Sequence, residues 1–385
     1  MDFNFTEEQI MIKDAARDFA RTELLPGVIE RDETETEPVE QLKMMQESGF
    51  MSMMTDPKYG GEGMDTLSYV LAMEEISKTD ASAAVVMSIQ NSLVNWGLEH
   101  YANEEQKEKY LVPMCTGKAF GAFALSEPEA GSDATKQRTT AEDKGDYYLL
   151  NGIKNWISNA SIADYFIVFA HTHPEKRHHG INAFIVEKGT EGFEIGPKEN
   201  KMGLRASHTH SLMFNDVKIP KKNRIGEDGF GFKLAMLSLN GGRIGIAAQA
   251  LGIAQGALDL ALQYSKERKA FGKLISEHQA IAFKLAEMDI RTEAARNLVY
   301  KAAWLKDMHK NYNKESAAAK YYAAETAMYV TAEAVQIHGG YGYVKEYHVE
   351  RLMREAKLTQ IYEGTSEIQK IVVSRDLLQL NKTAR

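Results

Sequence analysis

The sequence is short of the features that mark secreted, membrane-spanning and nucleic-acid-binding proteins. Cys115 is the only cysteine among 385 residues, so no intrachain disulfide can form, which fits a reducing cytoplasm. The most apolar stretch, around residues 81–89, is far shorter than the roughly 18 uninterrupted apolar residues of a membrane span. Charged residues such as Glu7 and Lys13 interrupt any apolar signal region near the N-terminus. We therefore expect no membrane span, and a cytoplasmic protein, or one of the mitochondrial matrix where a transit peptide precedes this sequence.

Acidic residues outnumber basic ones, 54 against 46. The formal net charge is −8, whereas a protein that binds nucleic acid needs a basic field to attract phosphates. We therefore expect no nucleic-acid partner. The Lys and Arg residues that are present form several clusters, and one of these could still provide a local pocket for an anionic cofactor.

The usual nucleotide-binding and metal-binding motifs are missing too. No G-x-G-x-x-G pattern follows a predicted strand, since Gly226, Gly229 and Gly231 have a different spacing, and there is no P-loop. A Rossmann domain is therefore not expected. Histidines gather at 171–179 and 208–210, but no paired carboxylate or cysteine set accompanies them. A metal site is conceivable there, and we favour an exposed loop without a metal.

The residue pattern along the chain changes twice, from helical to strand-like and back to helical, which predicts an α+β protein of three domains. Residues 1–118 have helical patterns, with capping-box spacings at Thr6 with Gln9 and at Asn103 with Gln106. Residues 119–229 have short strands separated by Gly and Pro, and residues 230–385 are helical again. The middle part predicts a small antiparallel β-barrel or sandwich, with a hairpin around Asn151-Gly152. The last part predicts a four-helix bundle, with helices near 242–266, 276–308, 315–338 and 347–357 and a further helix from about Ser366.

Three segments carry a family resemblance. Phe123-Ala-Leu-Ser-Glu-Pro-Glu-Ala-Gly-Ser-Asp133 and Gln336-Ile-His-Gly-Gly-Tyr-Gly-Tyr343 resemble two signatures of the acyl-CoA dehydrogenase family. Gln360-Ile-Tyr-Glu-Gly-Thr-Ser-Glu-Ile-Gln369 is similar to the segment that bears the catalytic base in most members. These motifs occur in the family's order from one end of the chain to the other. Further matches are Trp156–Ser158, Arg268–Lys273 and Gly242–Gln255, the last of which is most similar to the short-chain (butyryl-CoA) branch.

The resemblance makes Glu363 the expected catalytic base. The local pattern alone places it in a short loop between helices, softened by Gly364, with Ser366 and Gln369 at the spacing of a capping box. Alone, that pattern is more typical of a surface carboxylate. A minority branch of the family has its base at the position of Gly242, and glycine leaves no rival to Glu363. In the family the backbone N–H of the base also meets the thioester oxygen.

The resemblance also implies FAD, shared between subunits of a homotetramer. The segment from Phe123 to Ser132 would meet the flavin ring, with Trp156 on its other side. Without the resemblance, a core aromatic in a hairpin would be the preferred interpretation of Trp156. Arg268 and glycines near the end of a helix would hold the pyrophosphate and adenine end of a neighbour's cofactor, although Gly339-Gly340 could be only a helix stop. The predicted FAD contacts are Phe123, Leu125, Ser126, Ser132, Trp156, Ile157, Ser158, Arg268, Phe271, His278, Gln279, Gln336, Gly339, Gly340, Thr365 and Glu367.

The implied reaction is the FAD-dependent α,β-dehydrogenation of a short- or medium-chain acyl-CoA to a trans-2-enoyl-CoA, as in fatty acid β-oxidation. Electron-transfer flavoprotein is the implied acceptor. Two alternatives keep the fold: an acyl-CoA oxidase that uses oxygen, and a non-catalytic flavoprotein relative. Many family members have an acidic residue where this chain has Asn240. The predicted substrate contacts are Ser132, Asn240, Arg243, Tyr362 and Gly364.

Overall fold

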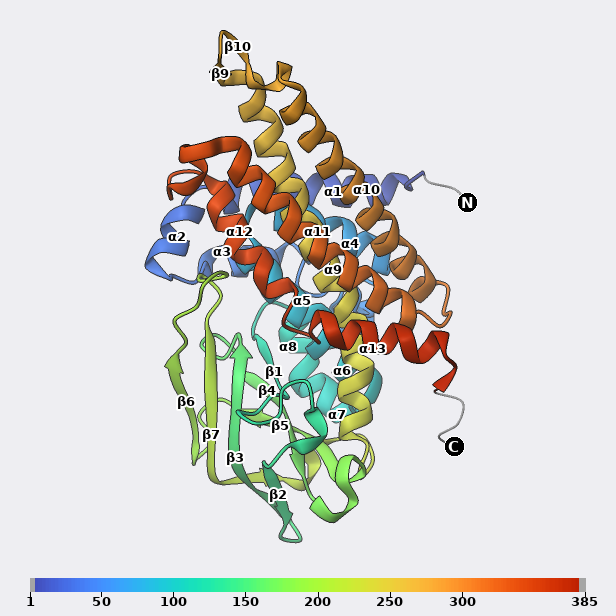
Figure 1. Cartoon of the computed structure of the whole chain (residues 1–385). Coiled ribbons are helices and arrows are strands. Elements are labelled where there is room, and N and C mark those ends of the chain that lie inside the picture. Colours follow the sequence, from blue (N-terminus) through green and yellow to red (C-terminus); the bar gives the residue numbers. More distant parts are fainter. Residues whose placement is uncertain (1–3, 381–385) are drawn as a thin grey trace.

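The chain begins and ends with helical parts, and a part built of β-strands lies between them in sequence (Figure 1). This computed structural model describes residues 4–380. The three-part architecture predicted from the sequence is confirmed, whereas the domain boundaries at 118 and 229 stay predictions. The N-terminal part contains α1 (Glu7–Phe19), α2 (Val28–Thr34), α3 (Val39–Glu47), α4 (Thr66–Thr79), α5 (Ala81–Ser88), α6 (Trp96–Tyr101), α7 (Glu104–Gln106) and α8 (Val112–Cys115).

Local capping signals set two helix starts in this part. Thr6 and Gln9 form a reciprocal capping box at α1, and Asn103 with Gln106 forms another at α7. Each pair satisfies two backbone N–H groups that would otherwise lack a partner at a helix start. Both boxes were predicted from sequence spacing.

The middle part forms one open, mixed sheet rather than the predicted barrel or sandwich. Its order is β6-β7-β3-β2-β4-β5-β8, with β1 beside β4, and the end strands β6 and β8 do not pair with each other. Both β1 and β2 run parallel to β4, so the sheet is not purely antiparallel. The strands are β1 (Gly121–Ala124), β2 (Thr140–Asp143), β3 (Tyr147–Ser158), β4 (Tyr165–His171), β5 (Ile181–Glu187), β6 (Phe193–Lys198), β7 (Thr209–Pro220) and β8 (Arg224–Ile225).

The predicted hairpin at Asn151-Gly152 is wrong, because β3 runs straight through this dipeptide. Gly152 has φ +142° and lies at a register shift between β3 and β7, so the irregularity is a bulge and not a turn. The Asn151 side chain also exchanges two hydrogen bonds with Asp216 on β7, at 2.8 and 3.0 Å. Pairing with β7 on both sides of the bulge therefore overrides the turn preference.

The C-terminal helices pack as predicted around one long helix, α9. It is apolar and long enough to cross a membrane by length and composition alone, but 83% of its apolar window is buried inside the protein, as in the core helix of a globular domain. Met73 of α4, Ala247 of α9 and Ala327 of α11 lie in one core cluster, which joins the two helical parts. The helices are α9 (Gly231–Glu267), α10 (Gln279–Asp307), α11 (Asn313–His338), α12 (His348–Thr359) and α13 (Ser366–Leu377), with a short hairpin of β9 (Lys269–Ala270) and β10 (Lys273–Leu274) after α9.

Candidate active site

The loop between α12 and α13 holds Glu363 in an unusual backbone conformation. Glu363 has φ +51° and the following Gly364 has φ +93°, so two consecutive residues are left-handed. Glycine adopts such angles without a steric penalty, whereas glutamate does not, and tertiary contacts must hold it there. The side-chain amide of Gln369 provides these contacts, since Nε2 donates to the carbonyl oxygens of Glu363 (3.2 Å) and Gly364 (2.8 Å).

The capping box predicted from Ser366 and Gln369 is wrong by one residue. Thr365 is the N-cap of α13, and its hydroxyl accepts from the N–H of Ile368 at 3.4 Å. Gln369 is turned back into the loop, and Ser366 Oγ donates to Glu325 of α11 at 2.8 Å. These residues therefore brace the loop instead of capping one another.

The Glu363 carboxylate points at a bare face of α9. A Cβ atom added to Gly242 would lie 2.2 Å from Glu363 Oε2 and 3.0 Å from Leu93 Cδ2, so only glycine leaves room for the acid. Oε2 is buried and accepts no hydrogen bond from any residue between 4 and 380. An unpaired buried acceptor of this kind is a common mark of a site that takes a ligand or moves a proton.

Burial raises the pKa of Glu363 to about 7, and the positive charges of Lys320 and Arg243 oppose the rise. A carboxylate with a pKa near neutrality is suited to general-base catalysis, because it is both ionised and basic at the pH of the cell. The neighbouring Tyr362 hydroxyl donates to Gln249 of α9, and burial raises its pKa well above the ordinary value.

Asn240 and Arg243 lie on the same helix as Gly242. Arg243 is buried and donates to the side-chain oxygens of Asn240 (2.9 Å) and Asn313 (3.0 Å). Among the residues that the structure describes, it forms no ion pair within 4.0 Å of a carboxylate. The structure therefore brings the predicted substrate contacts Asn240, Arg243, Tyr362 and Gly364 beside the predicted base.

A second group of predicted residues lies on the sheet. The buried Lys154 of β3 donates to Leu125 O (3.1 Å), Glu127 Oε1 (2.8 Å) and Gln137 Oε1 (2.7 Å), which ties the segment after β1 to the sheet. The N–H of Asn155 donates to Ser126 O at 2.9 Å, so Ser126 lies beside the strand residues around 156. Further along the same loop, Ser132 is exposed.

Trp156 is not the core aromatic that a hairpin would favour. It is 59% exposed and has φ +61°, while the next residue, Ile157, is buried and Ser158 is half-buried. An exposed indole on a strained strand position is available for stacking on a planar ligand.

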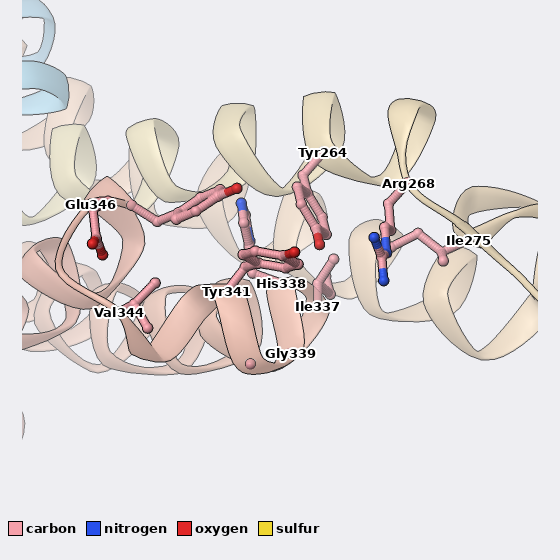
Figure 2. A pocket seen from close by; sticks show the side chains of 11 residues that line it. Tyr264, Arg268, Ile275, Ile337, His338, Gly339, Tyr341, Val344 and Glu346 are labelled. Atoms are coloured by element: carbon pink, nitrogen blue, oxygen red, sulfur yellow. The ribbon is translucent and has the colours of Figure 1, made fainter.

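A third group lies at the end of the helical bundle (Figure 2). A cavity of about 670 Å³ is lined by Arg268, Gly339 and Gly340 together with an aromatic wall in which Tyr264 stacks on His338 with ring centroids 4.3 Å apart. No residue of the Glu363 loop lines it. Gln279 and Gln336 are exposed, Phe271 is 95% exposed with φ +55°, and His278 Nε2 lies 3.1 Å from Ala270 O.

The histidines do not form a metal site. Within residues 4–380 no group of three or more His, Cys, Asp or Glu side chains is arranged to hold a metal ion. His171 is buried at the end of β4, contrary to the exposed-loop prediction, whereas His179 is exposed and its ring lies 4.0 Å from that of His178 at an interplanar angle of 38°.

Comparison with known proteins gives the family. Models of the acyl-CoA dehydrogenase N-terminal, middle and C-terminal domains match residues 6–118, 122–217 and 229–378. The chain belongs to the acyl-CoA dehydrogenase family. It is 50% identical over 374 residues to a short-chain-specific acyl-CoA dehydrogenase of Clostridium acetobutylicum, covering 97% of this chain and 99% of the relative.

Two solved structures are also very similar. Butyryl-CoA dehydrogenase from Megasphaera elsdenii has a TM-score of 0.97 at 50% identity, over 98% of this chain and 100% of that chain. A chain in a structure described as the electron transferring flavoprotein of Acidaminococcus fermentans has a TM-score of 0.97 at 51% identity, with the same coverage.

The residues near Trp156 and those near Arg268 fit the FAD that the family implies. Trp156 offers an exposed planar surface for a ring system. Arg268 forms no ion pair among the described residues, and a Cβ atom added at Gly339 or Gly340 would meet nothing within 4 Å, which suits the close approach of a phosphate. These two sets lie in separate parts of one chain, as expected for a cofactor held between subunits.

Sequence reasoning missed the residues that support the loop from a distance. Lys320 donates to Gly364 O at 2.7 Å from α11, and Gln369 and Glu325 brace the same loop. In sequence, Lys320 is an ordinary helix lysine, 44 positions from its partner. No local pattern could have found it.

Proposed function

We propose that this chain is an FAD-dependent acyl-CoA dehydrogenase that converts a short- or medium-chain acyl-CoA to the trans-2-enoyl-CoA. The observation that supports this best is the Glu363 carboxylate, which is buried, has a pKa raised to about 7, and points at a glycine face of α9 in a chain of this family. An exposed carboxylate of ordinary pKa at the same position would be a far weaker base near neutral pH.

In the proposed reaction Glu363 removes the proton from the α carbon of the thioester. The charge that develops on the thioester oxygen needs oriented donors, and the backbone N–H of Glu363 is the donor that we assign from this chain. The left-handed conformation of the loop fixes this N–H relative to the carboxylate. Bound FAD supplies the acceptor for the hydride that leaves the β carbon.

We assign the flavin end of the cofactor to Phe123, Leu125, Ser126, Ser132 and the segment Trp156 to Ser158. We assign the pyrophosphate and adenine end of the cofactor to a second copy of the chain, namely to its residues at the end of the helical bundle. Thr365 and Glu367 are further proposed contacts. A homotetramer follows as the proposed assembly. The proposed FAD contacts at the end of the helical bundle are Arg268, Phe271, His278, Gln279, Gln336, Gly339 and Gly340.

Electron-transfer flavoprotein is the proposed electron acceptor, and the cytoplasm is the proposed compartment. The names of the similar proteins support the acceptor, since one is a chain in an electron-transferring-flavoprotein structure and another is described as a subunit of a caffeyl-CoA reductase–Etf complex of Acetobacterium woodii. The short-chain names among the relatives support a short acyl group such as butyryl. Ser132, Asn240, Arg243, Tyr362 and Gly364 are the proposed substrate contacts.

The deciding experiment adds butyryl-CoA to the purified yellow protein without oxygen. We expect the flavin absorbance to bleach in the wild type, and Glu363→Gln to keep its FAD and fail to bleach. A protein that cannot take up FAD, or a Glu363→Gln variant that bleaches at the wild-type rate, would refute the proposal.

Two further titrations separate the alternatives. Repeating the reaction in air, and following hydrogen peroxide, distinguishes an oxidase from a dehydrogenase that needs electron-transfer flavoprotein. Repeating it with acyl groups from butyryl to palmitoyl, and with branched chains, defines the substrate range.

A further inference from the structure

Two residues of helix α11, Lys320 and Glu325, hold the Glu363 loop. Lys320 Nζ donates to Gly364 O at 2.7 Å, in the middle of the loop. Glu325 Oε1 accepts from Gln360 Nε2 and from Ser366 Oγ, both at 2.8 Å, at the loop's two ends. One helix therefore fixes the start, the centre and the end of the segment that carries the proposed base.

The hydrogen bond alone does not explain a lysine at position 320. Gly364 O already accepts from Gln369 Nε2 at 2.8 Å, so it would have a partner without Lys320. The Lys320 side chain is fully buried, and no carboxylate of the described residues lies within 4.0 Å of its ammonium group. A buried ammonium without a paired anion is costly, and an apolar side chain could fill the same space. The charge itself therefore calls for a reason.

That reason lies in the neighbouring carboxylate. Burial lowers the pKa of Lys320 to about 8, and the first charge that opposes this is Glu363. In the other direction, Lys320 is the first charge that opposes the rise in the pKa of Glu363. The two groups thus stabilise each other's ionised forms without direct contact.

We propose that Lys320 is a positioning residue for the base, which fixes the peptide after Glu363 and supplies the positive charge that lets a buried Glu363 ionise. This inference rests on the proposed function, since it concerns the same carboxylate. In this proposal Lys320 acts on the reaction through Glu363 and the Gly364 peptide.

Other charged and titratable groups face Glu363 from each packed element. Arg243 approaches from α9, Tyr69 from α4, and Tyr362 from the loop itself. Glu325 and Glu367 act on Lys320 from farther away. Burial raises the pKa of Tyr69 to about 12 and that of Tyr362 well above its ordinary value, so both tyrosines stay neutral. Among the described residues, Lys320 and Arg243 are therefore the positive charges that favour an ionised Glu363.

The test is the pH dependence of flavin reduction by butyryl-CoA in the FAD-loaded Lys320→Met enzyme, measured by anaerobic rapid mixing. Loss of one positive charge should move the acid limb of the rate profile upward by about one pH unit, which is a roughly tenfold lower rate below the midpoint. The matched control is Lys201→Met, since Lys201 is a half-buried lysine, with a pKa lowered to about 8, that also donates to a backbone carbonyl, Ser207 O at 2.7 Å. We expect the control to keep the wild-type midpoint.

A second variant keeps the charge and changes the geometry. Lys320→Arg should retain the wild-type midpoint within a few tenths of a pH unit and lose maximal rate, because a guanidinium cannot reproduce the single bond to Gly364 O. Should Lys320→Met not fold, a displaced midpoint in Lys320→Arg would overturn the proposal and an unmoved one with reduced rate would support it.

A purely structural role gives a different pattern. It would lower the thermal midpoint, the FAD content or the maximal rate of Lys320→Met and leave the pH midpoint unmoved, and that result would overturn the inference. A wild-type protein that fails to bleach at any pH would instead refute the proposed function, so the two failures are distinguishable.

Discussion

Replacing Glu363 by glutamine should stabilise the folded protein at alkaline pH while abolishing activity. The carboxylate has a pKa of about 7 in the fold, against an ordinary value of 4.5, because it is buried away from water. Folding therefore opposes ionisation of this one group. Glutamine is neutral at every pH and has nearly the same shape, so it removes that opposition.

The sign and size follow from proton linkage. Between pH 4.5 and 7 the unfolded chain has released this proton and the folded chain has kept it, so the free energy of unfolding falls as the pH rises. The pKa difference, about 7 minus 4.5, is about 2.5, which corresponds to about 3 kcal/mol at roughly 1.36 kcal/mol for each pH unit. Below pH 4.5 both states are protonated and the contribution vanishes.

Thermal unfolding of FAD-loaded wild type and Glu363→Gln at pH 5 and pH 8 measures this directly. We expect the variant's advantage in Tm to be larger at pH 8 than at pH 5 by about 3–6 °C, at matched protein concentration and scan rate. Glu30→Gln, at an exposed position of α2, should show no such change. A variant whose Tm difference from wild type is the same at both pH values would show that Glu363 does not titrate near neutrality, which would undo the argument.

Two other substitutions test the packing around the site. Gly242→Ala should lower the rate of flavin reduction by at least roughly tenfold, because its Cβ would lie 2.2 Å from Glu363 Oε2 and displace the carboxylate. The control is Gly241→Ala, whose Cβ would meet only Lys306 Nζ, at 3.7 Å, and which should keep the wild-type rate. Equal rates in the two variants would contradict the steric explanation. Lys154→Met should lower the free energy of unfolding by about 3 kcal/mol, since it leaves the buried Glu127 without its cation; denaturant titration checks this, and an unchanged midpoint would mean that the pair contributes little.

The parts of the fold that depend on neighbouring residues were predictable from the sequence. The capping boxes at Thr6 and Asn103 involve atoms only three residues apart, and both are present. The five C-terminal helices fall where the patterns place them, although α9 begins at Gly231, well before the predicted start. Distant segments do not disturb the two capping boxes, because each box uses the amide oxygen of the glutamine, whereas the amide nitrogen of Gln9 donates to Asp65 and that of Gln106 to Lys222 O and Arg224 O.

Predictions failed where a distant partner takes over a local signal. Asn151 and Gly152 form a bulge because β7 pairs with β3 on both sides of them and because the Asn151 side chain donates a hydrogen bond to Asp216. Gln369 does not cap its helix because its amide serves the carbonyls of the strained loop. The site shows the same contrast between local and distant signals. Short motifs predict Glu363 as the base, whereas only the folded structure shows that Lys320 lies beside its loop.

The arrangement of charges explains how Glu363 can be buried and still act near neutral pH. Burial alone would keep the acid protonated, while an ion pair in direct contact would make it too weak a base. Neither cation touches it, because Lys320 is engaged by a carbonyl, and Arg243 by the amide oxygens of Asn240 and Asn313. Neutral partners hold each cation in place and leave its charge uncompensated. An acidic residue at position 240 would instead neutralise Arg243 and raise the pKa of Glu363 further. In the proposed mechanism the neutral Asn240 therefore leaves the charge of Arg243 free to favour the ionised form of Glu363.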